Sequence, residues 1–177
     1  MDLRIRLVGP ARLRLEPAGV EALLGGRLAL QPARRSLALQ ARLQPQAGGS
    51  LAVQLDGRWN PDRWQLALQG RSLALEPFQR LAGVPGQLSG VASGQLQARL
   101  QPSGASCSGR WQVPRLRWQA PGGRSITADQ LALRCSGDAL TLVSPQWQAA
   151  GWRGQARVAL ALASGALQAQ LEARPPG

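Results

Sequence analysis

The residue types that most often carry out catalysis are scarce in this chain. It contains no His, the commonest general base and transition-metal ligand, and its nine acidic residues are scattered without the local spacing of a metal-binding loop. The segment Gly90-Val91-Ala92-Ser93-Gly94 lacks the spacing of a nucleophile elbow, and a chain without Lys cannot complete a phosphate-binding Gly-Lys loop. We therefore expect no catalytic residues, no metal site and no cofactor, and a protein that is not an enzyme.

Two cysteines, Cys107 and Cys135, are the remaining reactive side chains. Cys107 shares its sequence parity with Trp111, and Cys135 shares its parity with Leu133. Side chains of one parity point to one face of a strand, so we expect both thiols on an apolar face. Two outcomes remain open. The thiols could form a disulfide, which needs Cα atoms within about 7 Å and an oxidising compartment, or they could stay as two buried free thiols.

The net charge of +12 comes from 21 arginines, and they are dispersed along the chain rather than gathered in a run of five or more. Such a charge is typical either of a partner with negative charge or of a solvated arginine face. Nucleic-acid binding needs exposed aromatic rings beside the basic groups, whereas Trp111 and Trp118 share the parity of apolar neighbours. We therefore expect no nucleic-acid partner, and at most weak, salt-sensitive binding to anionic surfaces.

Apolar and polar residues alternate with a period of two through most of the sequence, as at Leu3–Leu7, Leu37–Leu43 and Ala156–Leu162. This period is typical of half-buried antiparallel strands. Turn-forming residues such as Pro121-Gly122-Gly123 separate these runs about every ten residues. The pattern predicts an all-β protein whose meandering antiparallel amphipathic strands form a curled open sheet. A closed sandwich, barrel or solenoid that binds other proteins is the alternative architecture.

Two segments favour short helices, at about residues 17–24 and 77–82, because each has an early Pro and a Gly after its end. The strand residues before them also match, since Leu13-Arg14-Leu15-Glu16-Pro17 is echoed sixty residues later by Leu73-Ala74-Leu75-Glu76-Pro77. We therefore expect residues 1–177 to form one all-β repeat segment. Its repeat units would lie near 13–72 and 73–177.

If the sheet is an open gutter, residues of the apolar parity should line its concave face, and this wall would suit acyl chains. The candidate lining residues are Leu37, Leu39, Leu51, Val53, Leu55, Leu66, Leu68, Leu96, Leu100, Leu131, Leu133, Val158 and Leu160. The same residues would also suit the packed core of a closed sheet.

The stretch from residue 58 to 100 resembles the AsmA-like and TamB family of diderm bacteria. The resemblance rests on Leu73-Ala74-Leu75-Glu76-Pro77-Phe78, on Gly86-Gln87-Leu88-Ser89-Gly90, and on residues 59–68, which look like the family's frequent strand pair that begins with Trp. The alternative resemblance is to type II secretion system protein N, which is also a Leu- and Trp-rich periplasmic β protein.

The family resemblance implies a taco-shaped β-groove in a periplasmic protein anchored in the inner membrane. Its implied role is to conduct phospholipid toward the outer membrane or to support outer-membrane assembly, with phospholipid acyl chains and an outer-membrane assembly protein as partners. No apolar stretch of this chain reaches the roughly 18 residues that span a bilayer. The membrane anchor is therefore expected outside this segment, which the resemblance implies to be an internal part of a longer chain.

Overall fold

The computed structural model describes residues 3–7, 9–15, 20–81, 83 and 85–175. Strands dominate this part of the chain, with one 3-10 turn and one short α-helix. In chain order the elements are β1 (Leu3–Arg6), β2 (Ala11–Leu15), β3 (Val20–Gln31), η1 (Pro32–Arg34), β4 (Ser36–Pro45), β5 (Ser50–Arg58), β6 (Arg63–Ala74), α1 (Glu76–Leu81), β7 (Gln87–Gln101), β8 (Gly104–Gln119), β9 (Ser125–Gly137), β10 (Ala139–Ala149), β11 (Trp152–Ala161) and β12 (Leu167–Arg174).

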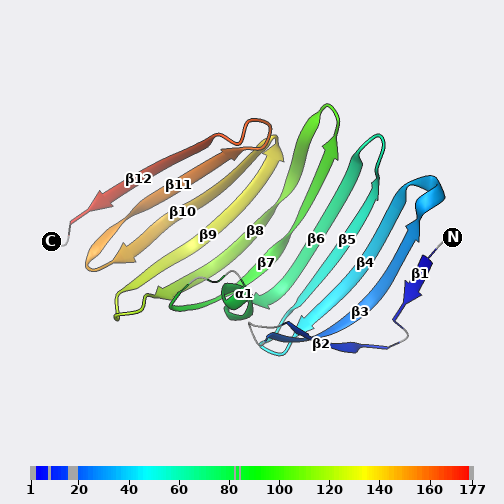
Figure 1. Ribbon diagram of the computed structural model, residues 1–177. Coiled ribbons are helices and arrows are strands. Elements are labelled where there is room, and N and C mark those ends of the chain that lie inside the picture. Colours follow the sequence, from blue (N-terminus) through cyan, green and yellow to red (C-terminus); the bar gives the residue numbers. More distant parts are fainter. Residues whose placement is uncertain (1–2, 8, 16–19, 82, 84, 176–177) are drawn as a thin grey trace.

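Within the described ranges, twelve strands form one antiparallel sheet in a single layer (Figure 1). From β3 to β12 each strand pairs with the next in the chain, while β1 and β2 both pair with β3 at the first edge. The sheet does not close on itself, so β1 with β2 and β12 form its two free edges. The expected all-β open antiparallel sheet is therefore confirmed, in place of the closed sandwich or barrel.

The pairing register sorts the strand residues onto two faces. Leu28, Leu39, Leu55 and Leu66 lie directly opposite one another on β3 to β6, in a row that continues to Ala98. We call this side the apolar face. The next row, Gln40, Gln54, Ala67 and Gln97, points the other way and belongs to the polar face. Across β3 to β12 the described strand residues of the apolar face include no Arg, Asp or Glu.

A line of irregular pairing crosses the middle strands of the sheet. The register shifts between Gly70 and Leu73 on β6, and again between Gly90 and Ser93 on β7. Farther along, Pro114 in β8 and Pro145 in β10 lie in similar interruptions, where a residue without an N–H is tolerated. Bulges bend and twist the strands that contain them. The sheet is therefore expected to bend along this line.

The buried side chains form two groups, one on β8 to β10 and one at the end of the sheet near α1. The helix α1 lies against β7 and also reaches β3 (Figure 1). The group near α1 includes Ala22, Leu73, Ala74 and Ala92, each less than 9% exposed. Gln79 of α1 is buried as well, and its amide donates to the Gly86 carbonyl and accepts from the Leu88 N–H, both at 2.7 Å. No large side chain of the described residues is completely buried, so the sheet encloses no extensive core.

One of the two predicted helices is present in the structure, and the other is wrong. Residues 77–81 are helical as predicted, within α1, while Ala82 lies outside the described residues. The helix predicted at 17–24 is wrong over residues 20–24, which form the first part of β3, and residues 17–19 lie outside the described residues. A helix of about two turns is marginal by itself, whereas this segment pairs on both sides, with β2 and with β4.

Candidate functional site

All thirteen residues singled out from the sequence lie on the apolar face. Leu37, Leu39, Leu51, Val53, Leu55, Leu66, Leu68, Leu96 and Leu100 form one contiguous group on β4 to β7. Leu131 and Leu133 on β9, and Val158 and Leu160 on β11, form a second group that Leu140 and Leu142 of β10 connect. Trp111 pairs with Leu133 and links the second group toward the first.

The sequence-based selection omitted several members of the same face. Leu28 and Leu30 of β3, Trp64 of β6, and Leu140 and Leu142 of β10 share its rows. Each has the parity of its apolar neighbours, so the alternation that identified the other residues could have identified these too.

The apolar face is accessible to solvent over most of its area. Twelve of the thirteen residues are partly exposed, and Leu100 is 49% exposed. Toward the second edge the exposure rises, with Leu167 and Leu171 of β12 at 66% and 69%. An exposed apolar surface that extends over many strands is unusual for a soluble protein and indicates a binding function.

Tryptophan rings lie across glycines on this face. A Cβ atom added at Gly57 would meet the ring of Trp64, which is directly opposite on β6. A Cβ added at Gly154 would meet the backbone carbonyl of Glu172 on β12 first, and then the Trp147 ring at 3.0 Å from Cε2. The glycines provide room for the rings to lie close to the backbone, so these large side chains add apolar area without standing far above the sheet.

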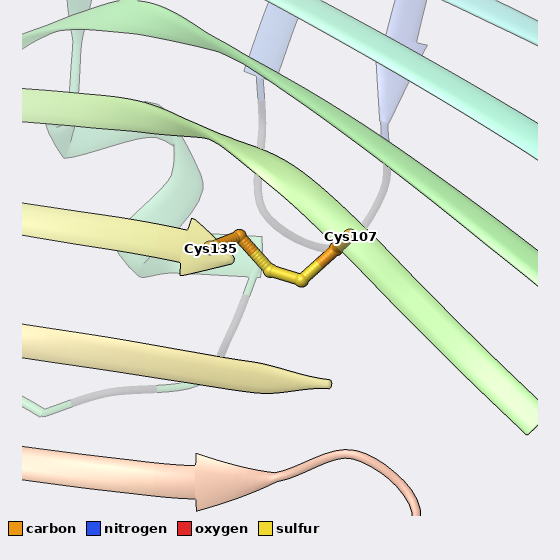
Figure 2. Close-up of a disulfide and its surroundings, with 2 residues drawn as sticks. All are labelled: Cys107 and Cys135. Carbon is orange, nitrogen blue, oxygen red and sulfur yellow. A yellow bond between two sulfur atoms is a disulfide. The ribbon is translucent and has the colours of Figure 1, made fainter. Parts of the chain in front are cut away.

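Cys107 and Cys135 are joined by a disulfide between β8 and β9 (Figure 2). Their Cα atoms lie 5.5 Å apart, and both side chains are buried on the apolar face. The register pairs Cys107 with Gly137 and Gly109 with Cys135, so the bond runs diagonally between neighbouring rows. Gly109 and Gly137 carry no side chains that would compete for this space.

The polar face contains a hollow of about 910 Å³ near the first edge of the sheet. Its lining includes the polar-face rows around Ala29, Ala38 and Asp56. Each apolar-face residue in the lining is next to a polar-face residue that also lines the hollow, as Ile5 is next to Arg4 and Arg6. Thirteen of the nineteen lining residues belong to the polar face, and the six of the apolar face, such as Leu28 and Leu37, alternate with them along the strands. The hollow therefore opens on the polar face, a feature that sequence parity does not reveal.

The described residues contain no group of three or more potential metal ligands, and none of their helices is long and apolar enough to cross a membrane. The chain matches no protein-family model, and no curated protein or solved structure is significantly similar to it. The fold and the apolar face by themselves define the class: a single-layered, open, amphipathic antiparallel β-sheet.

Proposed function

We propose that this chain is a segment of a periplasmic protein that binds phospholipid acyl chains along its apolar face. In this role it conducts phospholipid toward the outer membrane or supports outer-membrane assembly. The observation that carries the proposal is the apolar face itself, which spans β3 to β12 and, among the described residues, has no charged strand side chain and no second sheet packed on it.

Acyl chains suit such a surface because they need no hydrogen bonds and gain free energy from each apolar contact. Burying apolar surface contributes about 25 cal/mol per Å², so a long acyl chain can be held by many weak contacts and still slide from row to row. The Trp64 ring over Gly57 and the Trp147 ring beside Gly154 add apolar area to this surface.

The disulfide supports a location outside the cytoplasm. Disulfides persist in oxidising compartments such as the periplasm and are rare where thiols are kept reduced. The bond between Cys107 and Cys135 thus agrees with the periplasmic location that the AsmA-like and TamB resemblance implies.

Single charges placed on the apolar face test the proposal. We suggest Val53→Asp and Leu133→Asp, each on this face and each partly exposed, with Gln54→Asp on the polar face as the matched control. The parent chain is incubated with phospholipid vesicles, reisolated and analysed for bound lipid by mass spectrometry, beside a melting curve for every variant.

The two apolar-face variants should stay folded, because a carboxylate on an open face reaches water, but they should retain severalfold less phospholipid than the parent. The Gln54→Asp control should retain as much as the parent. Absence of lipid from the parent chain, or equal lipid on all variants, would refute the acyl-chain proposal.

A further inference from the structure

Five arginines surround the hollow on the polar face, accompanied by a single carboxylate. The arginines are Arg4, Arg6, Arg27, Arg58 and Arg63, and the carboxylate is Asp56. They come from four strands, β1, β3, β5 and β6, so residues up to sixty positions apart in the chain meet at one site.

The pairing register between strands places like charges directly opposite each other at this hollow. Arg6 lies directly across from Arg27, and Arg58 lies directly across from Arg63. Side chains in such positions have Cβ atoms only about 4.5 to 5.5 Å apart, and like charges there destabilise a sheet. The positive charges at this hollow therefore do not stabilise the folded protein by themselves.

No ion pair among the described residues neutralises these charged groups. Of the described residues, none forms an ion pair with any of the five arginines. The Asp56 carboxylate instead accepts a hydrogen bond from Gln54 at 2.8 Å, and the Arg27 guanidinium donates to Gln40 at 2.7 Å. The contact with Gln40 holds one guanidinium in place and leaves its other N–H groups available.

Small side chains form the floor of the hollow. Ala29 and Ala38 are opposite each other on β3 and β4, in the row between the two arginine pairs. Their short side chains leave room over the sheet that a Gln or Arg would fill, so a ligand can reach the arginines from the polar side.

We infer that this hollow binds a phosphate-bearing anion. Guanidinium groups bind phosphate oxygens through paired hydrogen bonds, and an anion between the opposed arginines would replace their repulsion with attraction. The phosphate could belong to a phospholipid headgroup or to a free phosphate compound, and both present the same chemistry to the site. The inference is independent of the proposed acyl-chain function, because it uses the opposite face.

Calorimetric titration with inorganic pyrophosphate at low salt tests the site. The two hollow variants are Arg6→Gln with Arg27→Gln, and Arg58→Gln with Arg63→Gln. The matched control is Arg110→Gln with Arg134→Gln, which removes a directly opposed arginine pair on the same face but away from the hollow. Each variant removes the same charge, so loss of net charge alone would affect all three equally.

The parent should bind pyrophosphate saturably, both hollow variants should weaken that binding by about tenfold or more, and the control should bind like the parent. Arg58→Lys with Arg63→Lys keeps the charge but removes the paired guanidinium donors. It should weaken binding severalfold, and it preserves the test if a glutamine variant does not fold. Absence of saturable binding by the parent, or equal weakening by the control, would overturn the inference.

A second titration identifies the source of the phosphate. Vesicles of phosphatidylcholine mixed with phosphatidylglycerol are compared with vesicles of phosphatidylcholine alone. If the hollow variants lose binding to the mixed vesicles as well as to pyrophosphate, membrane headgroups reach the site. If they lose only pyrophosphate binding, the ligand is a free phosphate compound.

Discussion

The indole of Trp111 on β8 crosses over β7 to lie against Gly70 on β6, two strands away. A Cβ atom built on Gly70 would meet Cη2 and Cζ3 of that ring. Gly94 of β7 lies in the same row between them, and a Cβ there would meet the backbone at Arg110 and Trp111. The three residues form one contact across three strands, with the ring packed where two neighbouring strands carry no side chains.

Replacing Gly70 should therefore destabilise the sheet through this ring. We expect Gly70→Ala to lower the free energy of unfolding by about 1 to 3 kcal/mol, because the added methyl forces Trp111 out of place. Gly25→Ala is the matched control, since a Cβ at Gly25 in β3 meets nothing within 4 Å. Urea denaturation measures both variants. A Trp111→Leu background should reduce the cost of Gly70→Ala, and an unchanged cost would contradict the ring as its cause.

The disulfide should make a large contribution to stability. It joins residues 28 positions apart, and cross-linking a loop of that length is expected to stabilise the fold by about 3 to 4 kcal/mol through the unfolded chain. We expect Cys107→Ala with Cys135→Ala to lose about this much in urea denaturation. Reductant should destabilise the parent similarly and leave the double variant unaffected. Two reactive thiols in unfolded protein prepared without reductant would show that the bond does not form.

The buried amide of Gln79 should hold α1 to the start of β7. Gln79→Ala leaves the Gly86 carbonyl and the Leu88 N–H without this partner, and each unsatisfied buried group costs about 1 to 3 kcal/mol. Amide hydrogen exchange should accelerate at Leu88, and the protein should unfold at lower urea. Gln87→Ala, at an exposed neighbouring position, is the control and should change neither quantity. Unaltered exchange at Leu88 in Gln79→Ala would argue against the clamp.

Reversing one charge of an opposed arginine pair should stabilise the sheet. Arg134 faces Arg110 across β8 and β9, so Arg134→Glu replaces a repulsive pair with an attractive one. Cross-strand charge pairs of this kind contribute about 0.2 to 1 kcal/mol. The melting temperature should rise at low salt, and the gain should shrink as salt screens the pair. A gain that is independent of salt would point to a cause other than charge.

Alternation was sufficient to predict most of the strands and, between the bulges, the face of their side chains, because the period of two is a local property of a strand. It separated Leu133 from Arg134, and it assigned Trp111 to the apolar face. The helix predicted at 17–24 rested instead on the early Pro17 and on Gly25 after its end, and it is wrong over residues 20–24. Pairing with Pro45 and Leu43 on β4 decides that segment, and those partners are about twenty residues away.

The opposed arginines and the hollow could not be predicted from the sequence, since both depend on the register between strands. The residue types of Arg58 and Arg63 do not indicate that the two side chains face each other. The length of the turn between β5 and β6 determines this pairing. Similarly, Ala29 and Ala38 become a floor only when η1 places them side by side. One residue more or fewer in either turn would shift these pairings.

The pairing of each strand from β3 onward with its successor also has a kinetic consequence. Most contacts in this sheet form within hairpins, so loops closed during folding are short and contact order is low for an all-β protein. Folding can begin at any hairpin and grow by addition of one strand at a time, much as a repeat protein propagates from its nucleus. Unfolding should correspondingly start at the free edges, with β12 exchanging its amide hydrogens before the strands that it borders.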